Sequence, residues 1–178
     1  MHIRFVTPEL KQIDALRCDA LALPWFSDER PLRGALGLID WRLCGFISKL
    51  VIDGAFAGAP LETVLIPGRP KFAMNKLFVV GLGSRAEFDD SCFARASQHM
   101  LKTMQRAGAR TLALVLPGRP TEAIAPTAAM ELLAVIAARH ADHEEIVLLE
   151  PGEAQRDMQL VVERERRRAR ATSDTEGS

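Results

Sequence analysis

A short glycine-rich turn follows an apolar segment near the middle of the chain, Lys76-Leu-Phe-Val-Val-Gly-Leu-Gly-Ser84. Residues 76–80 are typical of a buried strand, and the glycines after them leave backbone N–H groups open to an anion. Arg85 follows at once, and its guanidinium can bind a phosphate through two hydrogen bonds. The segment predicts either a contact with an anionic ligand or a plain reversal of the chain.

Two more loops with the same composition follow apolar segments, at residues 24–37 and 117–120. In open α/β sheets, ligands bind beyond the carboxyl ends of the strands, where such loops meet. The candidate anion site consists of Arg33, Gly81, Gly83, Ser84, Arg85, Gly118 and Arg119. The alternative is that glycine and proline only end the strands and that the arginines contact solvent.

The glycine turn also matches a relaxed dinucleotide fingerprint, G-x-G-x-x-A, in Gly81-Leu-Gly-Ser-Arg-Ala86. That fingerprint requires an acidic residue about 20 positions later, at the end of the next strand. The next apolar segment ends in Val115-Leu-Pro-Gly-Arg119 and has no acid there. Helix signals begin late, near Asp89, so the sequence disfavours a nicotinamide site, and we predict no cofactor.

The other residues capable of chemistry form no recognisable catalytic set. His140-Ala-Asp-His143-Glu144 could chelate a divalent metal, but its place between a helix and a strand is more typical of solvated polar residues. Neither an H-E-x-x-H nor a G-x-S-x-G motif occurs, and His99 is a lone histidine inside a helix. Cys18, Cys44 and Cys92 have no zinc spacing, so we expect buried free thiols. We predict no catalytic residue and no metal site.

Composition narrows the class of protein. The chain has 178 residues, 48% of them hydrophobic and 26% charged, which is typical of a globular protein. Its formal net charge is +0, whereas general nucleic-acid binders carry a basic excess. The local basic run Arg164-Glu-Arg-Arg-Arg-Ala-Arg170 lies where a helix would end, and there it offsets the helix dipole. No apolar run is long enough to span a bilayer, and no secretory signal is apparent, so we expect a cytoplasmic location.

Strands and helices alternate along the chain. Continuous apolar runs predict inner strands, and helical spacing predicts amphipathic helices. The expected strands are residues 3–7, 19–24, 61–66, 76–80, 111–116 and 145–149, and the expected helices are 36–53, 89–107, 126–138 and 153–169. This order indicates a three-layer α/β/α sandwich with a mixed, mostly parallel sheet. We expect one domain over residues 1–170 and a disordered tail over 171–178.

Several of these segments, in this order, resemble the N-terminal domain of the leucyl aminopeptidase (cytosol aminopeptidase) family. The resemblance covers roughly residues 18–118. It is carried by Asp19-Ala-Leu-Ala-Leu23, Leu50-Val-Ile-Asp-Gly-Ala-Phe-Ala-Gly58, Glu62-Thr-Val-Leu-Ile66, Lys76-Leu-Phe-Val-Val-Gly-Leu-Gly83 and Gly108-Ala-Arg-Thr-Leu-Ala-Leu-Val-Leu-Pro117. It implies a macro-domain-like fold, with the zinc ligands and catalytic residues of the family in a separate C-terminal domain.

The resemblance frames three hypotheses for function. The first is a stand-alone, non-catalytic relative with an assembly or regulatory role, which self-associates or pairs with an aminopeptidase-like catalytic chain. The second is a macro-like binder of a nucleotide or ADP-ribose, although the first loop, Pro24-Trp-Phe-Ser-Asp-Glu-Arg30, lacks the asparagines of macro domains. The third is a regulator that contacts nucleic acid through the arginine run, which the neutral net charge disfavours.

Overall fold

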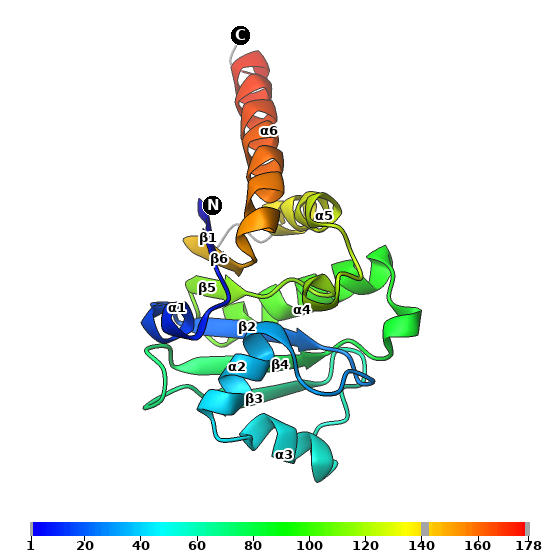
Figure 1. Cartoon of the computed structure of the whole chain (residues 1–178). Coiled ribbons are helices and arrows are strands. Elements are labelled where there is room, and N and C mark those ends of the chain that lie inside the picture. The colour runs from blue at the N-terminus through cyan, green and yellow to red at the C-terminus, as the bar shows by residue number, and fades with distance from the viewer. Residues whose placement is uncertain (1, 140–142, 177–178) are drawn as a thin grey trace.

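The computed structural model describes residues 2–139 and 143–176. A six-stranded sheet in the order β1-β6-β5-β2-β4-β3 forms its centre (Figure 1). All neighbouring strands run parallel except β3, which pairs with β4 in the antiparallel sense. The strands are β1 (His2–Val6), β2 (Ala20–Trp25), β3 (Thr63–Pro67), β4 (Lys76–Gly81), β5 (Thr111–Leu114) and β6 (Glu145–Leu149).

Helices cover both faces of this sheet, as Figure 1 shows. They are α1 (Leu10–Ala15), α2 (Gly34–Arg42), α3 (Phe46–Ile52), α4 (Asp90–Arg106), α5 (Pro126–Ala138) and α6 (Gly152–Glu176), with short 3-10 turns η1 (Arg85–Glu87) and η2 (Arg119–Thr121). Side chains alternate along each strand, so β2 sends Ala20 and Ala22 into one core and Leu21 and Leu23 into the other. The predicted three-layer α/β sandwich with a mixed, mostly parallel sheet is confirmed.

The N-terminus of α4 is where the sequence placed it. The Asp89 side chain accepts a hydrogen bond from the Cys92 backbone N–H at 2.7 Å, which caps the helix. The inner face of α4 buries Phe93, Ala96, Met100 and Met104, as the apolar spacing predicts. The helix therefore starts several residues after the glycine turn, unlike a dinucleotide-binding helix.

The prediction of a single helix over residues 36–53 was wrong. Cys44 and Gly45 have φ angles of 58° and 78°, and this left-handed backbone divides the segment into α2 and α3. The Asp40 carboxylate accepts hydrogen bonds from the N–H groups of Ile47 (2.8 Å) and Ser48 (3.1 Å) and so caps the second helix. The apolar stripe continues across the break, which is why the spacing alone indicated one helix.

The last helix is longer than expected. We predicted an end at Ala169, whereas α6 continues to Glu176 and includes residues 171–176 of the predicted tail. Residues 177–178 lie outside the described part of the chain. The Arg168–Glu165 ion pair at 2.9 Å stabilises the helical turn that precedes this continuation.

Candidate functional site

The predicted loops do meet at one edge of the sheet, because β2, β4 and β5 are parallel neighbours. The glycine turn at this edge is tied to the protein rather than left open. The Gly81 N–H donates to the Glu62 carbonyl at 2.8 Å, and its carbonyl accepts from the Leu61 N–H at 2.9 Å. A Cβ at Gly81 would lie 2.2 Å from the Ala59 carbonyl oxygen. Close approach of another backbone segment therefore explains this glycine.

The other two glycines of the candidate site are also used internally. Gly83 has a φ of 76° and donates its N–H to the Gly58 carbonyl at 2.9 Å. Gly118 has a φ of 74°, and a Cβ there would lie 2.6 Å from the ring of Phe88. Both positions require glycine for reasons of packing and backbone geometry.

A carboxylate already binds two donors that directly follow the glycines of this turn. Asp28, in the loop after β2, accepts hydrogen bonds from the Arg85 N–H and from the Ser84 hydroxyl, both at 3.1 Å. The Arg85 N–H holds the pKa of Asp28 below its ordinary value, and the Ser84 hydroxyl acts in the same direction. Of the backbone N–H groups that we expected to bind a ligand anion, those of Gly81 and Gly83 therefore bind backbone carbonyls, and that of Arg85 binds Asp28.

This contact predicts an acid-sensitive loop. Asp28 has a lowered pKa in the folded state, so its contribution to stability is complete above its ordinary pKa of 3.8 and is lost as the pH falls below that value. Asp28→Asn should therefore flatten the fall in melting temperature between about pH 5 and about pH 3. Thermal melts of both proteins across this range test it, and identical pH profiles would contradict it.

The three arginines of the candidate site have different environments. Arg33 is exposed immediately before α2, and Arg85 donates to the Thr121 carbonyl at 2.7 Å. Both lie near Glu29, whose pKa is raised by burial and partly lowered by these two guanidinium groups. Arg119, in contrast, is only 8% exposed. The structure thus brings Arg33 and Arg85 to one carboxylate and places Arg119 at another.

Arg119 forms a buried ion pair with Glu150, a residue that sequence reasoning missed. Its Nε and Nη2 atoms each lie 3.3 Å from Glu150 Oε2, and Nη1 donates to the Ile124 carbonyl at 2.7 Å. Glu150 is 1% exposed. Burial raises the pKa of Glu150, and Arg119 opposes this shift. The signal in the sequence was an acid directly after the last apolar strand.

A small cavity of about 170 Å³ adjoins this ion pair. Its lining comes from the ends of β5 and β6, from the start of α2 and from the loop after β1. The Oε1 atom of Glu150 has no hydrogen-bond partner within the described residues. Of the predicted site residues, Arg119 lines this cavity.

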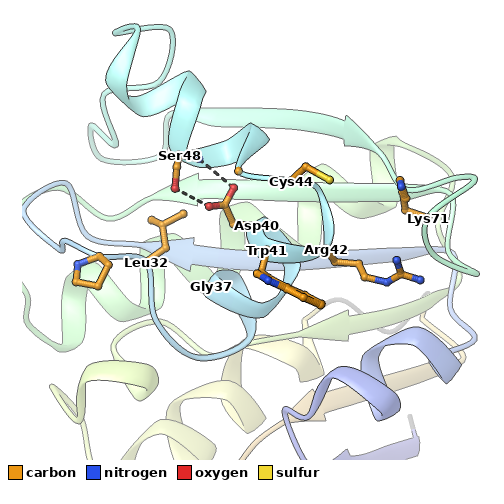
Figure 2. A pocket seen from close by; sticks show the side chains of 10 residues that line it. Leu32, Gly37, Asp40, Trp41, Arg42, Cys44, Ser48 and Lys71 are labelled. Atoms are coloured by element: carbon orange, nitrogen blue, oxygen red, sulfur yellow. Dashed lines mark hydrogen bonds between the residues drawn. The ribbon is translucent and has the colours of Figure 1, made fainter.

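A larger cavity of about 580 Å³ lies beside the turn between α2 and α3, and Pro31 and Leu32 of the loop after β2 also line it (Figure 2). Trp41 and Lys71 contribute to its lining. The Asp40 carboxylate, which also lines it, accepts a hydrogen bond from the Ser48 hydroxyl at 2.5 Å. Trp41 is 70% exposed. Sequence reasoning did not predict this cavity, because the cavity forms where the predicted single helix is broken.

Metal ligands do not gather anywhere in residues 2–139 and 143–176 in a group of three or more. The segment proposed as a chelator is only partly described, because residues 140–142 lie outside the description. His143 is buried, so the expectation that it is solvated was wrong, whereas Glu144 is exposed. The expectation of buried thiols was wrong for Cys44, which is exposed. It holds only in part for Cys18 and Cys92, which are half-buried.

Comparison with known proteins places the chain in a family. Residues 22–144 match the model of the cytosol aminopeptidase family, N-terminal domain. The chain belongs to the cytosol aminopeptidase family. A probable cytosol aminopeptidase of Thermosynechococcus vestitus is 33% identical over 126 residues, which cover 70% of this chain and 25% of that protein. One of a Cyanothece species is 26% identical over 127 residues, with the same shares covered.

The fold is found in two kinds of solved structure. A mutant of tomato leucine aminopeptidase aligns with a TM-score of 0.63 and 17% identity over 90% of this chain and 35% of that one. A Trypanosoma brucei macrodomain in complex with ADP aligns with a TM-score of 0.70 and 12% identity over 90% of this chain and 69% of that one. At these identities the likeness concerns the fold alone, and it confirms the macro-domain-like architecture.

This cytosol aminopeptidase homologue spans about a quarter of the length of the curated relatives it matches. Within the described residues, no helix combines the length and apolarity that crossing a bilayer requires. The cytoplasmic location expected from the sequence stays a prediction.

Proposed function

We propose that this domain is a non-catalytic assembly module that docks on an aminopeptidase-type catalytic domain. The matched segment corresponds to the N-terminal domain of the family, and in the relatives it makes up only 25% of the protein. In such relatives the domain has a much larger neighbour to contact. An assembly role requires a surface suited to that contact.

The α2–α3 corner, which we define as the exposed residues Trp41, Cys44, Phe46 and Ile52 of the two helices and their turn, supports this role most directly. Trp41 and Ile52 are 70% and 81% exposed, and Phe46 and Cys44 are also exposed. A tryptophan buries 150–250 Å² when covered, and it is enriched among the residues that dominate binding energy. The exposure of Trp41 beside a cavity is the observation that carries the proposal.

Trp41→Ser should weaken association at least about thirtyfold, because removal of a dominant interface residue costs roughly 2 kcal/mol or more. Light scattering after size-exclusion chromatography measures the mass of the domain alone and with a cytosol aminopeptidase of the same organism. Of the two tryptophans of this chain, Trp25 is buried, so an emission shift that arises in this domain on association reports mainly on Trp41.

Leu160→Ser is the matched control, since Leu160 is 68% exposed and belongs to α6, a helix that packs in the other core from α2 and α3. It should leave association unchanged. Equal association of the two variants with the aminopeptidase would refute the α2–α3 corner as the docking surface. Self-association without aminopeptidase binding would mean that the partner is a second copy of this chain. Zinc-dependent hydrolysis of a leucine amide by this domain alone would refute the non-catalytic role.

Binding of a phosphate-containing molecule is the less supported function. The glycine N–H groups of the turn bind backbone carbonyls, the Arg85 N–H binds Asp28, and Arg119 is already paired with Glu150. The nucleic-acid hypothesis is weakened as well, because Arg164 and Arg168 pair with Glu131 and Glu165 at 2.6 and 2.9 Å. Calorimetry with ADP-ribose tests the binding of a phosphate-containing molecule. Salt-dependent retention on DNA tests the nucleic-acid hypothesis.

A further inference from the structure

The cavity beside Glu150 contains a buried acceptor that no part of the described protein satisfies. Glu150 is 1% exposed, and its Oε2 atom accepts from Arg119, while Oε1 has no partner. Leaving a buried charged acceptor without a donor costs more than a typical hydrogen bond contributes. A ligand that donates a hydrogen bond to Oε1 would remove this cost.

Charge around the cavity favours a cationic donor at this end. Arg119 neutralises one carboxylate, and Glu122, which also lines the cavity, adds a second one that is exposed. A primary ammonium group supplies both positive charge and three donors. The Glu150 end of the cavity is therefore complementary to an ammonium group.

Another part of the lining offers hydrogen-bond donors. Gly34 and Ala35, the first residues of α2, line the cavity, and no side chain caps this helix. The first N–H groups of a helix have no partner within it, and the helix dipole makes this end positive. A carboxylate is the natural ligand of such a helix end.

The geometry points to an α-amino acid as the ligand of this cavity, with its ammonium group at Glu150 Oε1 and its carboxylate at the N-terminus of α2. The remaining wall is apolar and includes Val115 and Leu149. Pockets for drug-sized ligands have volumes of about 300–1,000 Å³, so a cavity of about 170 Å³ is suited to a smaller molecule. L-Alanine, with six non-hydrogen atoms, is such a molecule, and a nucleotide is not.

Binding of an amino acid at this site does not depend on the assembly role. If the domain does dock on an aminopeptidase catalytic domain, the ligand has the chemistry of the product that an aminopeptidase releases. The cavity would then make the assembly module responsive to product, and this last step alone depends on the proposed function.

Calorimetry with L-alanine, L-valine and L-leucine tests the site, with ethylamine, N-acetyl-L-alanine and ADP-ribose as comparison ligands. We expect L-alanine to bind with a dissociation constant of about 1 mM or below, which six atoms can supply. Ethylamine and N-acetyl-L-alanine each lack one of the two charges and should bind at least about tenfold more weakly. In a two-dimensional NMR spectrum, L-alanine should shift the amide signals of Gly34 and Ala35.

Glu150→Gln should weaken L-alanine binding at least about tenfold, whereas Glu87→Gln, a matched charge change on the exposed turn η1, should not. Thermal melts show whether each variant is folded. No amino-acid binding by the wild type, equal binding of N-acetyl-L-alanine, or undiminished binding by folded Glu150→Gln would each overturn the inference.

Discussion

Arg119→Leu should lower the free energy of unfolding by about 3–5 kcal/mol, because it leaves the Glu150 carboxylate buried without its counter-charge. Both partners are almost fully enclosed, at 8% and 1% exposure of their side chains. The variant also removes the donor to the Ile124 carbonyl, which holds the loop after η2. Urea denaturation followed by circular dichroism measures the loss.

The loss should depend on pH in a defined direction. Burial raises the pKa of Glu150 in the folded protein, and without Arg119 it rises further. A carboxyl group with a raised folded pKa opposes folding increasingly as the pH rises above its ordinary value of 4.5. The effect of Arg119→Leu should therefore be largest near neutral pH and should shrink as the pH falls toward 4.5.

The double variant Arg119→Leu/Glu150→Leu distinguishes a broken ion pair from a packing defect. Replacing both members of a buried pair by apolar groups is often neutral, so the double variant should regain most of the lost stability. It should not bind L-alanine. A double variant as unstable as Arg119→Leu would show that the guanidinium acts through packing and not through Glu150.

Gly81→Ala should destabilise the domain by about 3 kcal/mol, since overpacking of a rigid site has costs of this size. The added Cβ would lie 2.2 Å from the Ala59 oxygen and 2.5 Å from the Gly58 carbonyl carbon. These are backbone atoms, held by the hydrogen bonds from Leu61 to Gly81 and from Gly81 to Glu62, and they cannot rotate away. The end of β4 would have to separate from this segment.

Gly152→Ala provides the control for this substitution. A Cβ at Gly152 has nothing within 4 Å, and this residue is the first of α6. Its free energy of unfolding should change by less than about 0.5 kcal/mol. Equal urea midpoints for Gly81→Ala and the wild type would mean that the 58–62 segment is free to move and that Gly81 has another role.

Most of the fold could be predicted from the sequence because its signals are local. The continuous apolar segments predicted all six strands, with ends within two residues of those observed, and the capping signal near Asp89 predicted the start of α4. The break between α2 and α3 escaped because it depends on two left-handed residues within an unbroken apolar stripe. Spacing reports which face is buried, and it does not report a local change of φ.

The candidate site was predictable only as a location. Parallel strands bring their carboxyl ends to one edge, so the sequence correctly placed the loops at residues 24–37, 81–85 and 117–120 together. It did not reveal which donors remain free. Asp28 lies 57 positions from Arg85, and Glu150 lies 31 positions from Arg119, so both contacts arise from tertiary packing.

The order of strands and helices, and with it the family, was determined by the sequence alone, since apolar periodicity and turn residues are properties of neighbouring residues. Which contacts the arginines and glycines make was decided only by the tertiary structure. Arg119 looked like a ligand contact and is one half of a buried ion pair, and Gly81 looked like a phosphate turn and accommodates a crossing backbone. Burial and hydrogen bonding depend on residues distant in the chain, and for that reason only folding could assign these roles.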